Sequence, residues 1–282
     1  MLRGSVYTDG AAARSLRRRL LRWYAREKRD LPWRRTRDPY AVLVSEVMLQ
    51  QTQVSRVIPA YTAFLERFPT LRSLARTPLG DVLRAWSGLG YNRRARDLHR
   101  IAAASPRGLP RDVAALDLLP GIGAYTAGAV ACFATGARVA FADTNIRRTL
   151  GRIVLGRDVT EREAVAIDTE LMPRDAATWH HALMDLGAAI CVAGAPRCDV
   201  CPVADLCRGR GRLYATSRKQ QPAFATSDRR VRGRIVALLR ESEMSVVALR
   251  RAVGDERVPR LVNALVSEGL VERRGRRVAL PA

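Results

Sequence analysis

The fold of this chain is decided by residues 118–148, which read LLPGIGAYTAGAVACFATGARVAFADTNIRR. A Pro-Gly-Ile-Gly turn at 120–123 joins two apolar helical runs, and Asp143 stands where the next helix should begin. Backbone N–H groups at such a helix start suit an anion, for example a phosphate. A plain turn between packed helices, followed by Asp143 as an ordinary N-cap, explains the same residues. The rest of the chain has to separate these two interpretations.

Length and charge limit what the protein can do. The 282 residues suffice for one large domain or two to three small ones, each with a core of its own. A formal net charge of +22 indicates a polyanionic partner, nucleic acid rather than a membrane surface. No apolar run is long enough to span a membrane, and the basic N-terminus lacks the apolar core of a signal peptide. We therefore expect a soluble cytoplasmic protein with no membrane partner.

Apolar residues recur at helical spacing along most of the chain, and proline or capping residues separate the runs. A Thr160/Glu163 capping box marks one helix start. Further helices are expected over 15–28, from Asp38-Pro39 onward, from Thr77-Pro78 to Trp86, over 92–104 and over 179–190.

One of these helices carries Glu46, one turn away from apolar neighbours. A carboxyl beside apolar surface favours its neutral form, which a general acid working near neutrality requires. A half-exposed glutamate paired with an arginine is the commoner case for a lone helical Glu. The polar block at 50–53 that follows either carries hydrogen-bonding side chains into a groove or forms a solvated loop.

The turn at 87–91 reads Ser-Gly-Leu-Gly-Tyr, and its apolar residues are unusual for an exposed tip. Leu89 and Tyr91 can act as wedges between stacked bases. The alternative is that they pack inward as the tip folds back.

Four cysteines stand together as C-x6-C-x2-C-x5-C, at Cys191, Cys198, Cys201 and Cys207, whereas Cys132 stands alone on a helix and is expected in the core. Such a group in a cytosolic protein argues for a metal site rather than disulfides. Spacing alone leaves zinc and an iron–sulfur cluster both open, since each uses four cysteines.

Composition changes after the cysteines. Residues 212–228 read as a polar, basic linker. Residues 229–282 form a separate unit with helical patterns at 231–241, 246–253 and 258–268, then two short strands turning at Arg274-Gly275. Three helices and a hairpin resemble a winged helix, a common nucleic-acid-binding module. Docking against the rest of the chain is the other role open to this unit.

Together the motifs resemble those of the MutY-type adenine DNA glycosylases, in the helix-hairpin-helix glycosylase superfamily. The likeness covers roughly residues 15–210 and is carried, in order, by LPWR (31–34), DPY (38–40), SEVMLQQTQV (45–54), GLGY (88–91), LPGIGAYTAG (119–128), DTN (143–145) and the four cysteines.

The resemblance implies an all-α fold of two helical domains with a 4Fe-4S cluster on Cys191, Cys198, Cys201 and Cys207. The expected parts are an N-terminal helix (1–30), a helix-hairpin-helix domain (31–137), a cluster domain (138–211), the linker (212–228) and the winged-helix-like domain (229–282). The likeness assigns catalysis to Glu46, Asp143, Tyr125 and Asn145. It assigns DNA contacts to Trp33, Arg34, Gln51, Thr52, Leu89, Tyr91, Pro120, Gly121, Ile122 and Gly123.

The implied reaction removes adenine mispaired with 8-oxoguanine or guanine from double-stranded DNA. The base is flipped into a pocket, Glu46 donates a proton to N7, and ionised Asp143 stabilises the oxocarbenium-like sugar. Endonuclease III-type relatives carry a Schiff-base lysine where this chain has Tyr125, so little or no strand cleavage is expected. A monomer acting at the bacterial nucleoid is implied as well.

The chain departs from the family pattern in three places. No Nudix-like C-terminal domain is recognisable, which makes discrimination for 8-oxoguanine less secure than adenine excision. Asn92 stands where many members have a second tyrosine, and Arg197 is the only basic residue between the first two clustered cysteines. Two other functions stay open: a thymine or uracil glycosylase acting opposite guanine, and a non-catalytic iron–sulfur DNA-binding regulator.

Overall fold

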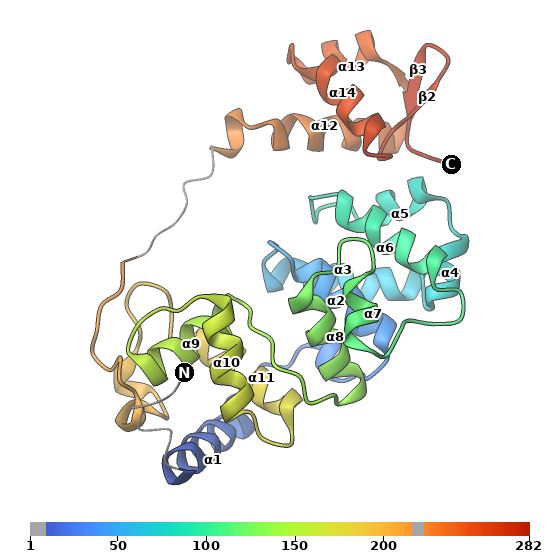
Figure 1. Cartoon of the computed structure of the whole chain (residues 1–282). Helices are drawn as coiled ribbons and strands as arrows, with labels where there is room; N and C mark the ends of the chain where they lie inside the picture. The colour runs from blue at the N-terminus through green and yellow to red at the C-terminus, as the bar shows by residue number, and fades with distance from the viewer. Residues whose placement is uncertain (1–9, 216–222) are drawn as a thin grey trace. The chain divides into compact units, whose positions relative to one another are not determined.

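The structure is a computed structural model that describes residues 10–215 and 223–282. In these residues helices dominate and the only sheet is small, which confirms the all-α fold (Figure 1). The helices up to the cysteines are α1 (Gly10–Glu27), η2 (Pro32–Arg34), α2 (Pro39–Leu49), α3 (Val54–Arg67), α4 (Leu71–Arg76), α5 (Leu79–Ala85), α6 (Arg93–Ala104), α7 (Val113–Asp117), α8 (Ala124–Thr135), α9 (Thr144–Leu155), α10 (Glu161–Leu171) and α11 (Ala176–Ala189).

Two short helical turns lie among the cysteines, and a third precedes the C-terminal domain. They are η3 (Cys198–Val200), η4 (Ala204–Leu206) and η5 (Phe224–Thr226). The C-terminal domain contains α12 (Asp228–Glu241), β1 (Met244–Ser245), α13 (Val246–Val253), α14 (Val258–Ser267), β2 (Glu272–Arg274) and β3 (Arg277–Ala279).

The chain divides into two compact units. The first comprises Met1–Val42, Pro110–Leu118 and Ile122–Arg218, and the second comprises Leu43–Leu109, Leu119–Gly121 and Lys219–Ala282. The domain boundaries expected from the sequence stay predictions. Part of the expected linker, residues 216–222, lies outside the described residues.

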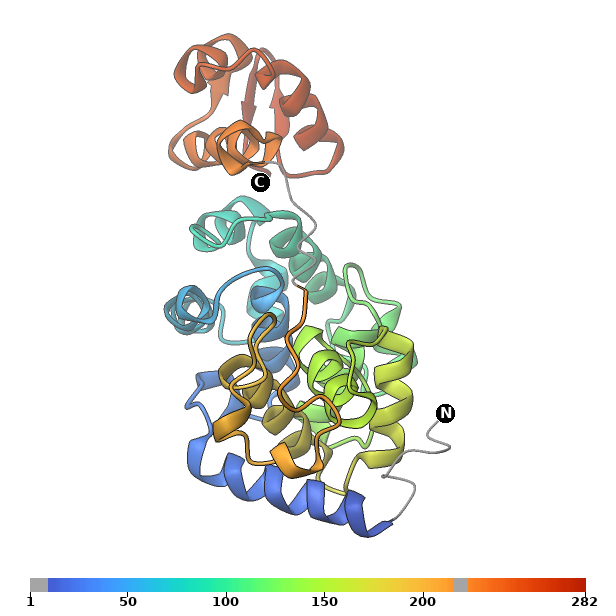
Figure 2. The same ribbon diagram turned by 90° about the vertical axis from the view of Figure 1, so that its left-hand side faces the viewer.

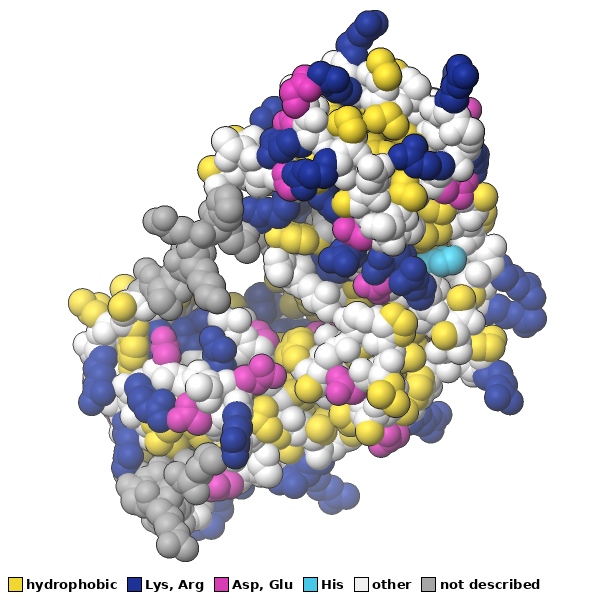
Figure 3. All heavy atoms as spheres, turned by 45° about the horizontal axis from the view of Figure 1, so that its top comes forward, with side chains coloured by type: hydrophobic (Ala, Val, Ile, Leu, Met, Phe, Trp, Pro, Cys, Tyr) yellow, Lys and Arg dark blue, Asp and Glu magenta, His cyan; other side chains and the backbone are white. Residues whose placement is uncertain are grey.

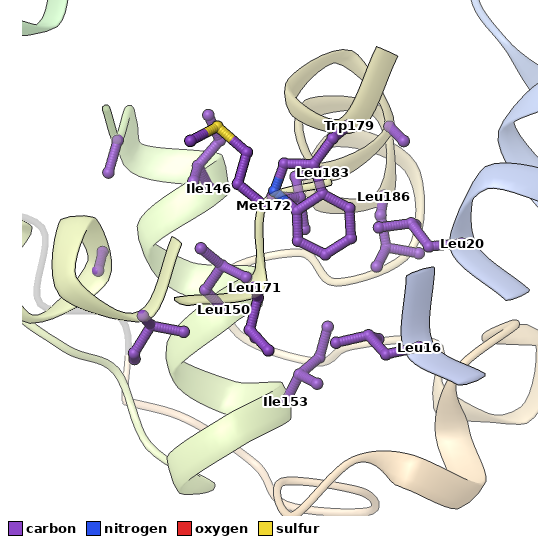
Figure 4. Close-up of a cluster of buried hydrophobic side chains, with 14 of the residues drawn as sticks. Leu16, Leu20, Ile146, Leu150, Ile153, Leu171, Met172, Trp179, Leu183 and Leu186 are labelled. Carbon is purple, nitrogen blue, oxygen red and sulfur yellow. The ribbon is translucent and has the colours of Figure 1, made fainter. Parts of the chain in front are cut away.

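The first unit is built around one hydrophobic core, in which α9 packs against α10 and α11, and α1 packs against α11. Leu16, Leu20 and Trp23 of α1 recur at helical spacing and are buried in this core. Figure 4 shows Leu16 and Leu20 among the other core side chains. Fully burying a leucine side chain contributes roughly 1.5–3 kcal/mol, so this face explains why the basic helix α1 holds its place. Cys132 is buried in the same core, as expected.

Capping residues set the helix starts. Thr160 Oγ1 accepts from Glu163 N at 3.3 Å, and Glu163 Oε2 accepts from Thr160 N at 2.8 Å, which confirms the capping box. Helix α11 begins three residues before the start expected at Trp179, because Asp175 accepts from Thr178 N and caps it there.

The second unit contains most of α2, helices α3 to α6 and the C-terminal domain. The C-terminal domain has the three helices and the hairpin that the sequence predicts (Figure 2). A two-residue strand, β1, escaped prediction because it is too short to show a period; it pairs with β3 in the antiparallel order β1-β3-β2. In the described part of the chain, no helix is both long and apolar enough to cross a membrane.

Candidate functional site

Asp143 caps helix α9 and is half-buried. Its Oδ1 accepts from Ile146 N at 2.7 Å, and its Oδ2 accepts from Asn145 Nδ2 at 2.9 Å. Burial raises the pKa of Asp143, and these hydrogen bonds, which stabilise the ionised form, oppose the rise. The carboxylate is therefore oriented from two sides, by a main-chain N–H and by the Asn145 amide.

Arg148 fixes Asn145 in turn. The Arg148 guanidinium donates to Asn145 Oδ1 and to Gly187 O, both at 2.6 Å, and to Cys191 O at 2.6 Å. A Cβ added at Gly187 would lie 2.7 Å from Asn145 Cβ, so only glycine allows α11 to come this close. No sequence pattern pointed to Arg148, because two of its partners, the carbonyls of Gly187 and Cys191, lie far along the chain.

Glu46 lies on α2 in the second unit and is 6% exposed, in agreement with its expected place beside apolar surface. Its neighbours Val44 and Val47 on the same helix are also buried.

Gln51 and Tyr91 have left-handed backbone conformations, with φ of 55° and 46°. Among the described residues they are the only non-glycine residues with positive φ. Such conformations cost about 1–3 kcal/mol each and gather at functional sites. Both positions are among those that the resemblance assigns to DNA contact, so independent backbone geometry supports a functional turn at each.

Arg94, which sequence reasoning missed, holds these two turns together. Its guanidinium donates to the carbonyls of Val47, Met48 and Gln50 at 2.6–2.9 Å. It also donates to the carbonyls of Leu89 and Gly90 and to Thr52 Oγ1, at 3.0–3.1 Å. The end of α2, the polar block and the 87–91 turn are thus organised around one buried cation.

The two apolar residues of that turn differ. Leu89 is 4% exposed and packs inward, so the inward-packed alternative describes this structure. Tyr91 is 41% exposed, and its hydroxyl accepts from Arg229 Nη1 at 3.1 Å. Entry of Leu89 into a duplex would require its side chain to leave the core; Tyr91 is already at the surface.

The Pro120–Gly123 turn leads into α8. Gly121 has φ of 73°, and a Cβ there would lie 3.1 Å from the Asp97 side chain, so glycine is needed on both counts. Gly123 is the N-cap of α8, which has neither a capping side chain nor an acidic residue in its first turn. The first N–H groups of α8 are therefore suited to an external anion such as a phosphate.

Three residues assigned to the base pocket lie in the first unit. Trp33 is buried. Arg34 forms a two-point ion pair with Asp185 at 2.8 and 2.9 Å, which gives it a structural role. Tyr125 is half-buried and meets the Phe141 ring edge-on, with centroids 5.6 Å apart.

The four clustered cysteines line one cavity. A single zinc ion needs its thiolates about 2.3 Å from one centre. Among residues 10–215 and 223–282, no three His, Cys, Asp or Glu side chains gather around such a centre, whereas four thiols surround a space between them. A cluster that gives each thiolate its own iron fits this arrangement better.

Arg152 is the buried cation of the cysteine loop. It donates to Val192 O at 2.7 Å and Ala193 O at 2.6 Å, and lies 4.0 Å from Cys191 Sγ. Burial raises the pKa of the Cys201 thiol to about 11 and also raises that of Cys191, where the charges of Arg152 and Arg148 oppose the rise. Positive charge therefore surrounds a site whose ligands must be thiolates.

The chain is similar to known DNA repair proteins. Residues 44–174 match the HhH-GPD superfamily base excision DNA repair protein, and residues 191–207 match the iron-sulfur binding domain of endonuclease III. The adenine DNA glycosylase of Mycolicibacterium smegmatis is 43% identical over 269 residues, covering 90% of this chain and 92% of that protein. The chain belongs to the adenine DNA glycosylase family. The adenine DNA glycosylase of Mycobacterium tuberculosis is 41% identical over 272 residues, with 90% and 89% covered.

The fold is shared more widely. A solved thermostable thymine-DNA glycosylase superposes with a TM-score of 0.63 at 27% identity, covering 71% of this chain and 97% of that one. Membership of the adenine DNA glycosylase family confirms the resemblance and the DNA partner, and excludes the non-catalytic regulator. The cofactor that the cysteine spacing left open is a 4Fe-4S cluster.

Proposed function

We propose that this chain is a monofunctional DNA glycosylase that hydrolyses the N-glycosidic bond of adenine mispaired with 8-oxoguanine or guanine. The observation that carries this proposal is Asp143, a half-buried carboxylate oriented by Ile146 N and Asn145 in a chain that matches adenine DNA glycosylases over 90% of its length.

In this proposal Glu46 acts as the general acid. It protonates N7 of the flipped adenine, which makes the base a better leaving group. Ionised Asp143 stabilises the positive charge that develops on the sugar, and water then completes the hydrolysis to leave an abasic site. Asn145, held by Arg148, keeps the carboxylate facing the sugar.

The remaining residues bind and position. Trp33, Arg34 and Tyr125 line the base pocket, and the Pro120–Gly123 turn with Ile122 holds a backbone phosphate. Gln51, Leu89 and Tyr91 enter the duplex, and Thr52 supports the turn through Arg94. The cluster is held by Cys191, Cys198, Cys201 and Cys207. When bound, it links these four positions of the loop after α11 to one another.

Strand cleavage is not expected. A lyase step needs an amine to attack the sugar, and the two lysines of the sequence are Lys28 and Lys219. Position 125 carries a tyrosine, whose hydroxyl forms no Schiff base. We further propose that the enzyme works as a monomer at the nucleoid.

A panel of duplexes tests the proposal. Base release is followed under single-turnover conditions with A:8-oxoguanine, A:G, T:G and U:G pairs, with and without hot alkali to separate base loss from strand cleavage. Adenine release from the first two duplexes, with cleavage only after alkali, is expected. Preferential release of thymine or uracil would replace the adenine proposal, and cleavage without alkali would refute monofunctional action.

A further inference from the structure

The C-terminal domain lies outside both matched family segments, which end at residue 207. It is docked firmly on α5 of the second unit. Gly80 N donates to Pro281 O at 2.8 Å, and a Cβ at Gly80 would lie 2.6 Å from that oxygen, so the close approach requires glycine. Arg84 and Arg240 each donate to a main-chain carbonyl across this junction, at 3.1 Å.

A second set of contacts joins the domain to α6. Glu268, at the end of α14, accepts from Arg232 at 2.5 Å and from Arg93 at 3.4 Å. The main-chain carbonyl of Glu268 also accepts from Arg96. The position of α12 relative to the 87–91 turn is therefore held from two sides.

Between α12 and this turn lies a groove of about 760 Å³, within the size range of sites that take nucleotide-sized groups. One wall holds Gln51 and Tyr91, the two residues with left-handed backbones. The other wall holds Arg229 and Arg232 of α12, together with Phe224 of η5. On the face that Figure 3 shows, basic side chains are spread over the surface.

The lining of the groove has a specific chemical character. It contains six arginines and one acidic residue, Glu268, which is already paired with Arg93 and Arg232. Two aromatic side chains reach solvent there, Tyr91 at 41% and Phe224 at 65% exposure. Arginines that track a phosphate backbone, combined with exposed rings on which bases stack, are the signature of a surface for an unpaired nucleic-acid strand.

We propose that the C-terminal domain forms one wall of a DNA-strand site, in which bases stack on Phe224 and Tyr91 while Arg229 and its neighbours neutralise the phosphates. This inference rests on the proposed function, since flipping an adenine leaves a locally unpaired strand for the groove to hold. An acidic protein segment is the competing occupant, and it would not need exposed rings.

The test is equilibrium binding of the full-length protein to a labelled duplex carrying a tetrahydrofuran abasic analogue opposite 8-oxoguanine. This duplex cannot be cleaved, so binding is measured apart from catalysis. Phe224→Ala should weaken binding roughly 5- to 100-fold without changing its salt dependence. Arg229→Gln should flatten the slope of log Kd against log salt by about one, because one phosphate contact is lost.

Val247→Ala and Arg251→Gln are the matched controls. Both residues are exposed on the C-terminal domain and do not line the groove, and Val247 is 74% exposed. Both controls should bind like the unaltered protein. Unchanged affinity and salt slope in the two groove variants would overturn the site and favour a protein segment as its occupant. Failure of the unaltered protein to release adenine would refute the proposed function instead.

Discussion

Arg94 and Arg152 are both buried and both donate to main-chain carbonyls of functional loops, one in each unit. They differ in how their charge is balanced. Arg152 pairs with Asp158 at 2.7 Å and lies beside a cluster cysteine. Arg94 has no carboxylate partner among the described residues, its Nε has no acceptor, and burial lowers its pKa to about 10.

The contrast separates two kinds of support. Two carbonyls that Arg94 binds, those of Val47 and Met48, lie at the C-terminal end of α2, where the helix dipole favours a cation. Carbonyl dipoles and the rings of Trp86 and Tyr91, rather than a carboxylate, therefore balance its charge, and its task is to shape the turns at 50–53 and 87–91. Arg152 shapes a loop as well, but its charge also offsets thiolates. Loss of Arg94 should therefore act mainly on the stability of the fold, and loss of Arg152 should act mainly on binding of the cluster.

Removing Arg94 should have the largest effect on stability. Arg94→Ala leaves several buried carbonyls without a donor, and we expect the free energy of unfolding to fall by roughly 3–5 kcal/mol. Urea denaturation followed by circular dichroism measures the change. Arg94→Lys is the control: an ammonium has three donors rather than a planar fork of five, so only part of the stability should return. A loss below about 1 kcal/mol in Arg94→Ala would contradict the organising role.

Removing the charge of Arg152 should cost less stability but should loosen the cluster. In Arg152→Gln the carbonyls of Val192 and Ala193 lose a charged donor, and we expect a loss of about 2–3 kcal/mol. Iron content and absorbance at about 400 nm should fall in the same variant. Full iron occupancy in Arg152→Gln would show that the charge of Arg152 is not needed to bind the cluster. The two buried arginines would then not differ in their roles.

Cys132, which lies outside the cysteine cavity, tests whether iron loss is confined to the cysteines that line it. Cys132 lies 3.5 Å from His180 Nδ1 in the core, and burial raises its pKa to about 12, so it stays a thiol. Cys132→Ala should cost about 1 kcal/mol and leave the iron content unchanged. Cys198→Ser, its counterpart in the cavity, should lose iron. Equal iron loss in both variants would refute the assignment of the four cavity cysteines as ligands.

The smallest expected effect is a shift in pH dependence. Burial raises the pKa of Asp143 above its unfolded value, so its contribution to stability is present at low pH and is lost as pH rises through the raised pKa. Catalysis needs the ionised form, so single-turnover rates should fall on acidification at a higher pH than for an ordinary aspartate, whose pKa is about 3.9. Arg148→Leu should move this acid limb further up, because Arg148 favours the carboxylate. An acid limb that stays in place would show that Arg148 acts through Asn145 alone.

Local signals carried much of the sequence prediction. Asp143 before Thr-Asn is an N-cap pattern, and the structure has that cap. The turn at Arg274-Gly275 and three segments with apolar residues at helical spacing were enough to predict the hairpin and the three helices of the C-terminal domain. In each case the deciding contacts lie within a few residues, so the sequence records them directly.

The supporting arginines could not be found in this way. The sequence is rich in arginine, and most partners of Arg94 and Arg148 are backbone carbonyls, up to 47 residues away, which leave no trace in residue identity. The left-handed backbone of Gln51 was equally hidden, because glutamine does not favour that region. Leu89 looked exposed from its glycine neighbours, yet the turn folds its side chain into the core.

The central claim is that Glu46 and Asp143 together excise adenine, and single-turnover adenine release from an A:8-oxoguanine duplex tests it most directly. Glu46→Gln keeps the size of the side chain but removes the acid. At saturating enzyme it should slow release by roughly 10²- to 10⁴-fold while binding of the uncleavable abasic duplex is unchanged. Release at the rate of the unaltered protein, with binding intact, would contradict the account.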